Sequence, residues 1–198
     1  MAKAYRFDMT KYKKALDFSF NFYNNKYRKG FKAPYFTYLS SVSILIIENS
    51  GSTDEAIAGL LHDAYELNNG KGTVNQITKR FGNNVSNIIK QCSHLNNIKI
   101  SNENWVEEKK KFIETIPKKS QSSLFVLLCD KLCSINCLIN DHNKIGKRLW
   151  KHHIPDSNQI TWYYKTLCKN LKKNLKNHKN LKDKFQRNVN ELDYLTKK

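Results

Sequence analysis

Apolar residues recur along this chain at helical spacing. In the run that Pro117 closes, Trp105, Lys109, Phe112 and Ile116 fall at i, i+4, i+7 and i+11, which places them on one helix face. No segment shows the period-two alternation, β-branched enrichment and hairpin turns that indicate strands. The pattern predicts an all-α protein.

Caps, glycines and prolines delimit the other helices. Ser52 to Asp54 carry start signals, Thr73 is a candidate N-cap, and Gly82 is a candidate stop. Helices are expected over 12–22, 38–47, 54–67, 74–81, 85–92, 105–116, 124–139 and from 160 toward the C-terminus. The helix over 124–139, LFVLLCDKLCSINCLI, is the most apolar, and Ser120 to Ser123 separate it from the helix before it.

Length and composition predict one compact domain over 1–198. A chain of 198 residues suits a single core, and its apolar residues are spread along the whole length. We see no run approaching the roughly 18 apolar residues that cross a bilayer, and no apolar signal-peptide core. The five cysteines form no disulfide-like framework, so we expect free thiols and a cytoplasmic location.

The net charge of +18 suits either nucleic acid or small anionic substrates. Compositional drift is an alternative explanation, because the chain is rich in Lys, Asn and Ile together. On a continuous helix most of the C-terminal lysines would form a basic stripe: Lys165, Lys169, Lys172, Lys173, Lys176 and Lys179. We interpret them as a solvated face, with nucleic-acid binding as the less favoured hypothesis.

Two polar clusters interrupt apolar runs. His62 and Asp63 lie in AGLLHDAYEL, where Glu66 would share a helix face with His62, and Asp130 lies in LLCDKLC. Burying such groups costs several kcal/mol unless they are paired or bound to a metal. A metal joining His62, Asp63 and Asp130 would satisfy all three with ligands suited to Mn, Fe or Zn.

The order of PYFTYLSSVSILI, IAGLLHDAYE, ITKRFGNNVSNII and LLCDKL resembles the metal-dependent HD phosphohydrolases, in particular the small alarmone (ppGpp) hydrolase branch. WVEEKKKFIETI and LWKHHIPDSNQITWYYKTL are similar to later family segments. The resemblance implies a compact helical bundle with a family-like core of about 12–175 and a basic helical extension of about 176–198. It also implies a divalent metal, most often Mn, and removal of phosphate or pyrophosphate from ppGpp or 3′-phosphorylated adenine nucleotides.

The same resemblance implies metal ligation by His62, Asp63 and Asp130 and assigns Glu66 as catalytic acid or base. The chain departs from the family at three places. Tyr38 stands where the family usually has an earlier His ligand, and Leu67 replaces the second acid after Glu66. Ser134 stands where the family usually has a nucleotide-contacting Asn.

Substrate contacts are implied for a further set of residues, and for the two tyrosines a place in the core is an equal alternative. The set is Arg28, Lys29, Lys109, Ser134, Tyr163 and Tyr164. The leading hypothesis is metal-dependent hydrolysis of a small phosphorylated nucleotide. The alternative is a catalytically degenerate HD-fold protein that binds nucleotide or a partner without turnover.

Overall fold

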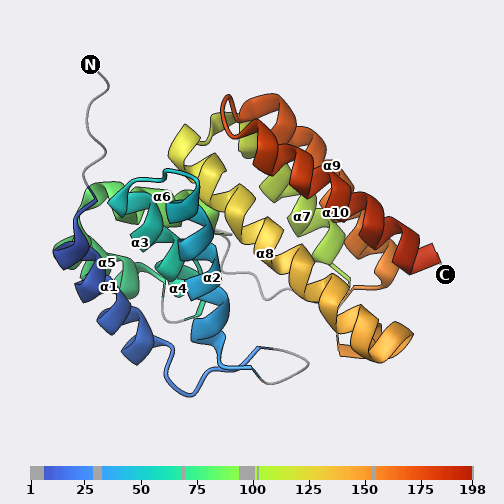
Figure 1. Cartoon of the computed structure of the whole chain (residues 1–198), viewed down its shortest axis with the longest axis horizontal. Coiled ribbons are helices and arrows are strands. Elements are labelled where there is room, and N and C mark those ends of the chain that lie inside the picture. Colours follow the sequence, from blue (N-terminus) through green and yellow to red (C-terminus); the bar gives the residue numbers. More distant parts are fainter. Residues whose placement is uncertain are drawn as a thin grey trace.

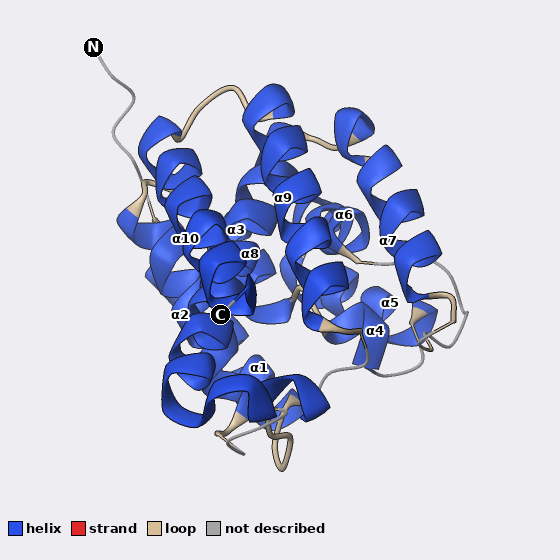
Figure 2. Cartoon of the chain, turned by 90° about the vertical axis from the view of Figure 1, so that its right-hand side faces the viewer, coloured by secondary structure: helices blue, strands red, loops and turns tan. Residues whose placement is uncertain are grey.

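The computed structural model describes residues 7–28, 33–67, 70–93, 101, 103–152 and 155–197. The helices are α1 (Met9–Phe22), α2 (Tyr35–Glu48), α3 (Thr53–Leu61), α4 (Ala64–Leu67), α5 (Lys71–Phe81), α6 (Asn83–Cys92), α7 (Trp105–Glu114), η1 (Ile116–Lys118), α8 (Gln121–Ile145), η2 (Gly146–His152), α9 (Ser157–Asn174) and α10 (Lys179–Lys197). Figure 2 shows no strand in this described part, whose only bridge joins Tyr27 to Pro34. The predicted all-α class is confirmed.

Helix α8 runs through the middle of the molecule (Figure 1). It packs against α2, α3 and α6 on one side and against α9 and α10 on the other. The buried apolar side chains of these helices form one cluster. The chain is therefore the single helical bundle that the sequence predicted, with α8 as its axis.

The length and composition of α8 follow from this central place. The helix with its continuation, Gln121–Lys151, is long and apolar enough to cross a membrane by those two criteria, and 67% of its most apolar window is buried inside the bundle. The sequence expectation that no such stretch exists was therefore wrong. Cys129, Cys133 and Cys137 on this helix are free thiols.

A polar cap begins α3 where the sequence predicted a helix start. The Ser52 hydroxyl accepts from the backbone N–H of Glu55, and the Glu55 carboxylate accepts from the Ser52 N–H at 2.7 Å. This capping box satisfies two of the N–H groups left open at a helix start. Thr73 is not a cap, because α5 already begins at Lys71.

The C-terminal lysines do not lie on one continuous helix. Helix α9 ends at Asn174, and the chain turns through His178, whose φ is 61°, before α10 begins. Lys165 pairs with Asp193 of α10 at 2.8 Å, so one member of the expected stripe joins the two helices. The condition on which the stripe depended, one continuous helix over 165–179, is therefore not met.

A close approach at the start of α3 gives a stability test. A Cβ at Gly51 would lie 2.3 Å from Ile46 Cγ2, 2.8 Å from the Ile46 carbonyl oxygen and 2.9 Å from Phe125 Cε1. Because a backbone atom is among these neighbours, Gly51→Ala should lower the free energy of unfolding by about 1–3 kcal/mol, measured by urea denaturation. Gly72→Ala is the control, since no heavy atom lies within 4 Å of its added Cβ. Equal stability of the two variants would contradict the prediction.

Candidate active site

His62 and Asp63 lie at a break between two helices. Helix α3 ends at Leu61 and α4 begins at Ala64, so the segment predicted as one helix is interrupted at these two residues. The His62 ring is buried, and its Nδ1 lies 2.8 Å from the carbonyl oxygen of Gly59. A proton on Nδ1 can donate to that oxygen, which leaves Nε2 facing the site.

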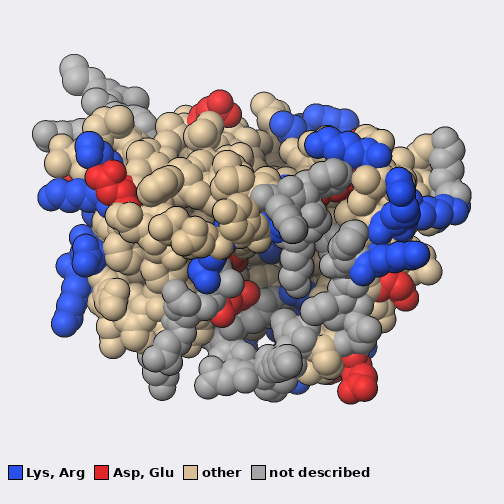
Figure 3. All heavy atoms as spheres, turned by 90° about the horizontal axis from the view of Figure 1, so that it is seen from below, with Lys and Arg blue, Asp and Glu red and all other residues tan. Residues whose placement is uncertain are grey.

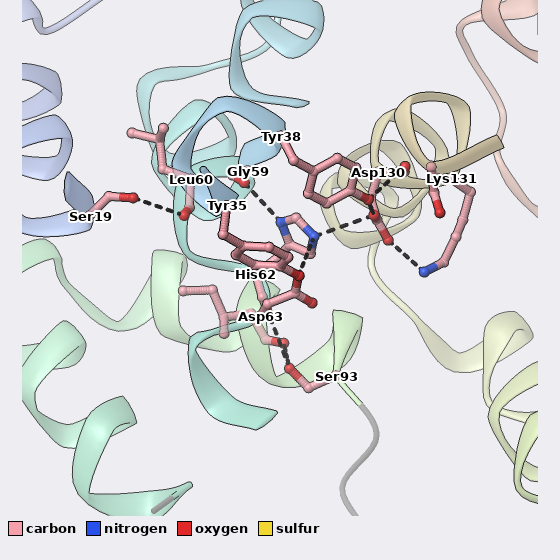
Figure 4. A network of polar contacts seen from close by, with 12 residues as sticks. Ser19, Tyr35, Tyr38, Gly59, Leu60, His62, Asp63, Ser93, Asp130 and Lys131 are labelled. Atoms are coloured by element: carbon pink, nitrogen blue, oxygen red, sulfur yellow. Dashed lines mark hydrogen bonds and ion pairs between the residues drawn. The ribbon is translucent and has the colours of Figure 1, made fainter. Parts of the chain in front are cut away.

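Asp130 reaches the same point from α8, although 67 positions separate it from Asp63. His62 Nε2 lies 3.3 Å from Asp130 Oδ1 and 3.4 Å from Asp63 Oδ2 (Figure 4). His62 Nε2 is also one of the few buried polar atoms of the described residues that has no hydrogen bond. The three residues that the sequence nominated as metal ligands therefore lie together.

The first turn of α2 adds two tyrosine hydroxyls to the cluster. Tyr35 donates to Asp63 Oδ2, and Tyr38 donates to Asp130 Oδ1. Lys131 lies 2.7 Å from the other oxygen of Asp130. Tyr38 thus lies beside His62, as its place in the family pattern implied. Sequence reasoning did not single out Tyr35 or Lys131, although both adjoin its motifs.

These contacts set the charges of the site. Burial disfavours the imidazolium of His62, but the Asp63 and Asp130 carboxylates outweigh it and raise the pKa of His62 to about 9. Burial likewise opposes the charge on Asp130, yet Lys131 and His62 hold the pKa of Asp130 below its usual value. Burial and the Asp130 charge raise the pKa of Tyr38 well above its usual range. The site therefore contains a neutral phenol within an ion-paired cluster.

Both carboxylates of the cluster line a cavity of about 550 Å³, within the range of about 300–1,000 Å³ that is usual for ligand pockets, and the buried His62 ring does not line it. Its lining residues are Lys26, Tyr27, Arg28, Tyr35, Tyr38, Asp63, Asp130, Lys131, Ser134 and Leu138. Figure 3 shows acidic and basic atoms together at the hollow in the middle of one face. Acidic groups beside three cationic side chains suit a ligand that carries phosphate.

The predicted substrate residues divide between this cavity and the core. Arg28 lines the cavity, with its Nη2 3.6 Å from Asp141 Oδ2. Ser134 also lines it, but its hydroxyl already accepts from Tyr164 at 2.8 Å. Lys29 lies outside the described residues.

Lys109, Tyr163 and Tyr164 lie within electrostatic reach of Lys131 and do not line the cavity. The Lys109 ammonium is 5.2 Å from the centre of the Tyr163 ring and 5.7 Å from that of Trp105. Burial and the nearby Lys131 lower the pKa of Lys109 to about 8. Both tyrosines are buried, and the Tyr163 hydroxyl has no hydrogen-bond partner within the described part of the chain. Neither tyrosine lines the cavity.

Glu66 is exposed and is likewise absent from the cavity lining. Burial is the main cause of the raised pKa values of Tyr23 and Tyr163, and the charge of Glu66 adds to it, so the carboxylate lies within electrostatic reach of both rings. It shares no continuous helix with His62, because α3 and α4 are separate. The predicted i, i+4 pairing on one helix was therefore wrong.

The donor types of the cluster suit a divalent cation. One imidazole nitrogen without a hydrogen bond and two carboxylates are ligands of Mn, Fe or Zn sites. Across the described ranges, no three His, Cys, Asp or Glu side chains are already spaced as a cation cage. A cation would therefore require the carboxylates to reorient around His62.

The comparisons with known proteins agree with this fold. A family model described as the HD domain matches residues 15–155. The chain belongs to the HD-domain family. None of the curated proteins matches it.

Two solved structures show the same fold. One is a metazoan ortholog of SpoT that hydrolyzes ppGpp and plays a role in starvation responses. It has a TM-score of 0.75 and 19% identity, over 94% of this chain and 97% of its own. The other is lmo0812 from Listeria monocytogenes EGD-e, with a TM-score of 0.66 and 20% identity, over 81% of this chain and 99% of its own.

The imidazole that the family resemblance leads us to expect at position 38 can be introduced by substitution. Because Tyr38 lies beside His62 and Asp130, Tyr38→His should place a second imidazole at the site and raise the content of bound Mn²⁺. Metal analysis after dialysis against Mn²⁺ measures this content. An unchanged metal content in a folded variant would show that position 38 does not face the cation.

The raised pKa of His62 predicts a pH-dependent stability in chelator. Protonated His62 stabilises the fold, so its contribution is complete below about pH 6.5 and is lost as the pH rises toward 9. From about pH 6.5 to 8, the free energy of unfolding should fall by up to about 1 kcal/mol per pH unit. Lys109, whose pKa is lowered to about 8, is already half deprotonated at the upper end of this window and contributes an opposite slope there, so the fall is steepest near pH 7. His62→Gln should flatten this slope, and an equal slope in both proteins would count against the imidazolium.

Proposed function

We propose that this protein is a metal-dependent hydrolase of a small phosphorylated nucleotide, with Mn²⁺ as the metal. The observation that carries the proposal is the convergence of Asp63 and Asp130 on the buried ring of His62, where both carboxylates line a cavity that also presents basic side chains. Membership of the HD-domain family supports it.

The proposed metal ligands are His62 Nε2 and the carboxylates of Asp63 and Asp130. A bound divalent cation would polarise a phosphoryl oxygen and supply a hydroxide nucleophile near neutral pH. The rest of the chain positions these ligands. The Gly59 carbonyl fixes the His62 ring, and Lys131 holds the outer oxygen of Asp130.

Basic side chains bind the phosphates in this proposal. Arg28 enters the cavity above the Tyr38 ring, with 5.8 Å between the guanidinium carbon and the ring centre. Its planar guanidinium matches two phosphate oxygens, whereas Lys26 and Lys131 act as point charges. Lys29, which follows Arg28 in the sequence, is proposed to add charge. Asp141 holds Arg28 in the free protein, so the substrate must compete with a 3.6 Å ion pair.

Proton transfer is assigned to Glu66. Because Glu66 is exposed and does not line the cavity, it would act through an intervening water. Ser134 is proposed to contact the substrate, and Tyr164 would support it by donating to the Ser134 hydroxyl. Lys109 and Tyr163 do not line the cavity and are proposed to act from a distance, with the charge of Lys109 adding to that of Lys131 in favour of an anion.

The proposed reaction is removal of a phosphate or pyrophosphate from the 3′ position, as in ppGpp. The structural similarity to a protein that hydrolyzes ppGpp supports this choice of substrate. The alternative is a protein that binds the nucleotide without turnover. The position of Tyr38, whose hydroxyl binds a proposed metal ligand, favours that alternative.

Product analysis tests the proposal. With Mn²⁺ present, the protein should convert ppGpp into GDP and pyrophosphate. Chromatography of the reaction mixture measures both products. Asp130→Asn should abolish turnover, and Glu66→Gln should lower kcat about a hundredfold or more. Glu107→Gln is the matched control, since Glu107 is an exposed acid of α7 that pairs only loosely with Lys110.

Two results would contradict the proposal in different ways. Turnover that survives Asp130→Asn would remove the metal cluster from the reaction. Tight binding of ppGpp and 3′-phosphorylated adenine nucleotides with no product from either would establish the alternative.

A further inference from the structure

We propose that Tyr35 and Tyr38 form a hydroxyl lock on the candidate metal site. Their hydroxyls hold the carboxylate oxygens that a cation would need, and they leave those oxygens when the cation binds. The inference rests on the metal site of the proposed function and adds a control of that site by the chain itself.

The position of each hydrogen bond carries the inference. Tyr35 donates to Asp63 Oδ2, which is the oxygen 3.4 Å from His62 Nε2. Tyr38 donates to Asp130 Oδ1, which is the oxygen 3.3 Å from the same nitrogen. Each hydroxyl therefore binds the carboxylate oxygen that faces the imidazole.

Lys131 shows the contrasting arrangement. It binds Asp130 Oδ2, the oxygen that points away from His62, at 2.7 Å (Figure 4). A group on the outer oxygen can orient a ligating carboxylate and remain in place when a metal binds. A donor on the inner oxygen competes with the cation, because a hydroxyl proton and a metal ion are attracted to the same lone pairs.

The backbone at the start of α2 fixes the positions of both tyrosines. They lie on the first turn of α2, and the N–H of Tyr35 donates to the carbonyl of Lys26 at 2.8 Å. The two rings lie 5.9 Å apart, and the Tyr38 ring is 6.1 Å from that of His62. Both rings also line the cavity, which gives them space to turn away from the carboxylates.

Titration with Mn²⁺ alone tests the lock. Tyr35→Phe and Tyr38→Phe each remove one competing donor and keep the ring, so each should lower the Kd for Mn²⁺ about tenfold. The double variant should lower it about a hundredfold. Electron paramagnetic resonance of free Mn²⁺ or calorimetry measures the Kd, with no substrate present.

Tyr12→Phe is the matched control. It removes another buried tyrosine hydrogen bond, from Tyr12 to Ser43 at 2.8 Å, which contacts none of the proposed ligands. Its Kd for Mn²⁺ should equal that of the unchanged protein. Thermal unfolding in chelator checks that every variant folds. If Tyr38→Phe does not fold, the Kd of Tyr35→Phe alone tests the lock.

The other outcomes overturn the lock or separate it from the proposed reaction. A weaker Kd in the Phe variants would mean that the hydroxyls orient the ligands or bind the metal, and an unchanged Kd would mean that they do not compete. Failure of all these proteins to bind Mn²⁺ would remove the lock together with the metal-dependent function. Tighter binding in the variants without hydrolysis by any protein would support the lock while refuting the proposed reaction.

Discussion

The buried Asp130 carboxylate is the interaction around which this bundle is organised. It lies in the long central helix α8, only 5% exposed, where an unpaired charge would cost several kcal/mol. Tyr38 and His62 lie against one oxygen and Lys131 against the other. Tyr38 comes from α2 and His62 from the end of α3. Both helices must therefore contact α8 at a defined position along its axis if this one carboxylate is to be satisfied.

Close packing between α2 and α3 supplies that alignment. A Cβ at Gly59 would lie 2.6 Å from Ile46 Cδ1 and 3.2 Å from Ser43 Cα, so glycine allows the two helices to approach. Ser43 is itself buried and donates to the Ala56 carbonyl at 2.8 Å. The packing of Gly59 against Ile46 and Ser43, away from the proposed ligands, therefore sets the distance between the tyrosines of α2 and the histidine at the end of α3.

The replacement of an expected imidazole by a phenol changes the chemistry of the site. A neutral histidine offers a lone pair, whereas the Tyr38 hydroxyl donates a proton to a carboxylate that would otherwise be free for a cation. The site is thereby ion-paired and hydrogen-bonded within the protein. If a cation binds here as proposed, the phenol would compete with it, while its hydrogen bond satisfies the buried carboxylate in the absence of metal.

Much of the architecture follows from the sequence alone. Helical periodicity determined the all-α class, and the apolar run around Asp130 identified the helix that became the axis of the bundle. The cost of burying His62, Asp63 and Asp130 singled them out as a group that must find partners, and the structure brings them together. Such features are local or follow from burial, so a single chain can reveal them.

Tertiary structure decided the remainder. The break at His62, the contacts of Tyr35 and Lys131, and the turn between α9 and α10 depend on which distant side chains are available. The pairing of Arg28 with Asp141 joins a loop to the far end of α8. Sequence periodicity specifies which face of a helix is buried, but it does not specify the partner or the height at which two faces meet. Those depend on packing across the whole core, and they determine which oxygen each hydroxyl reaches.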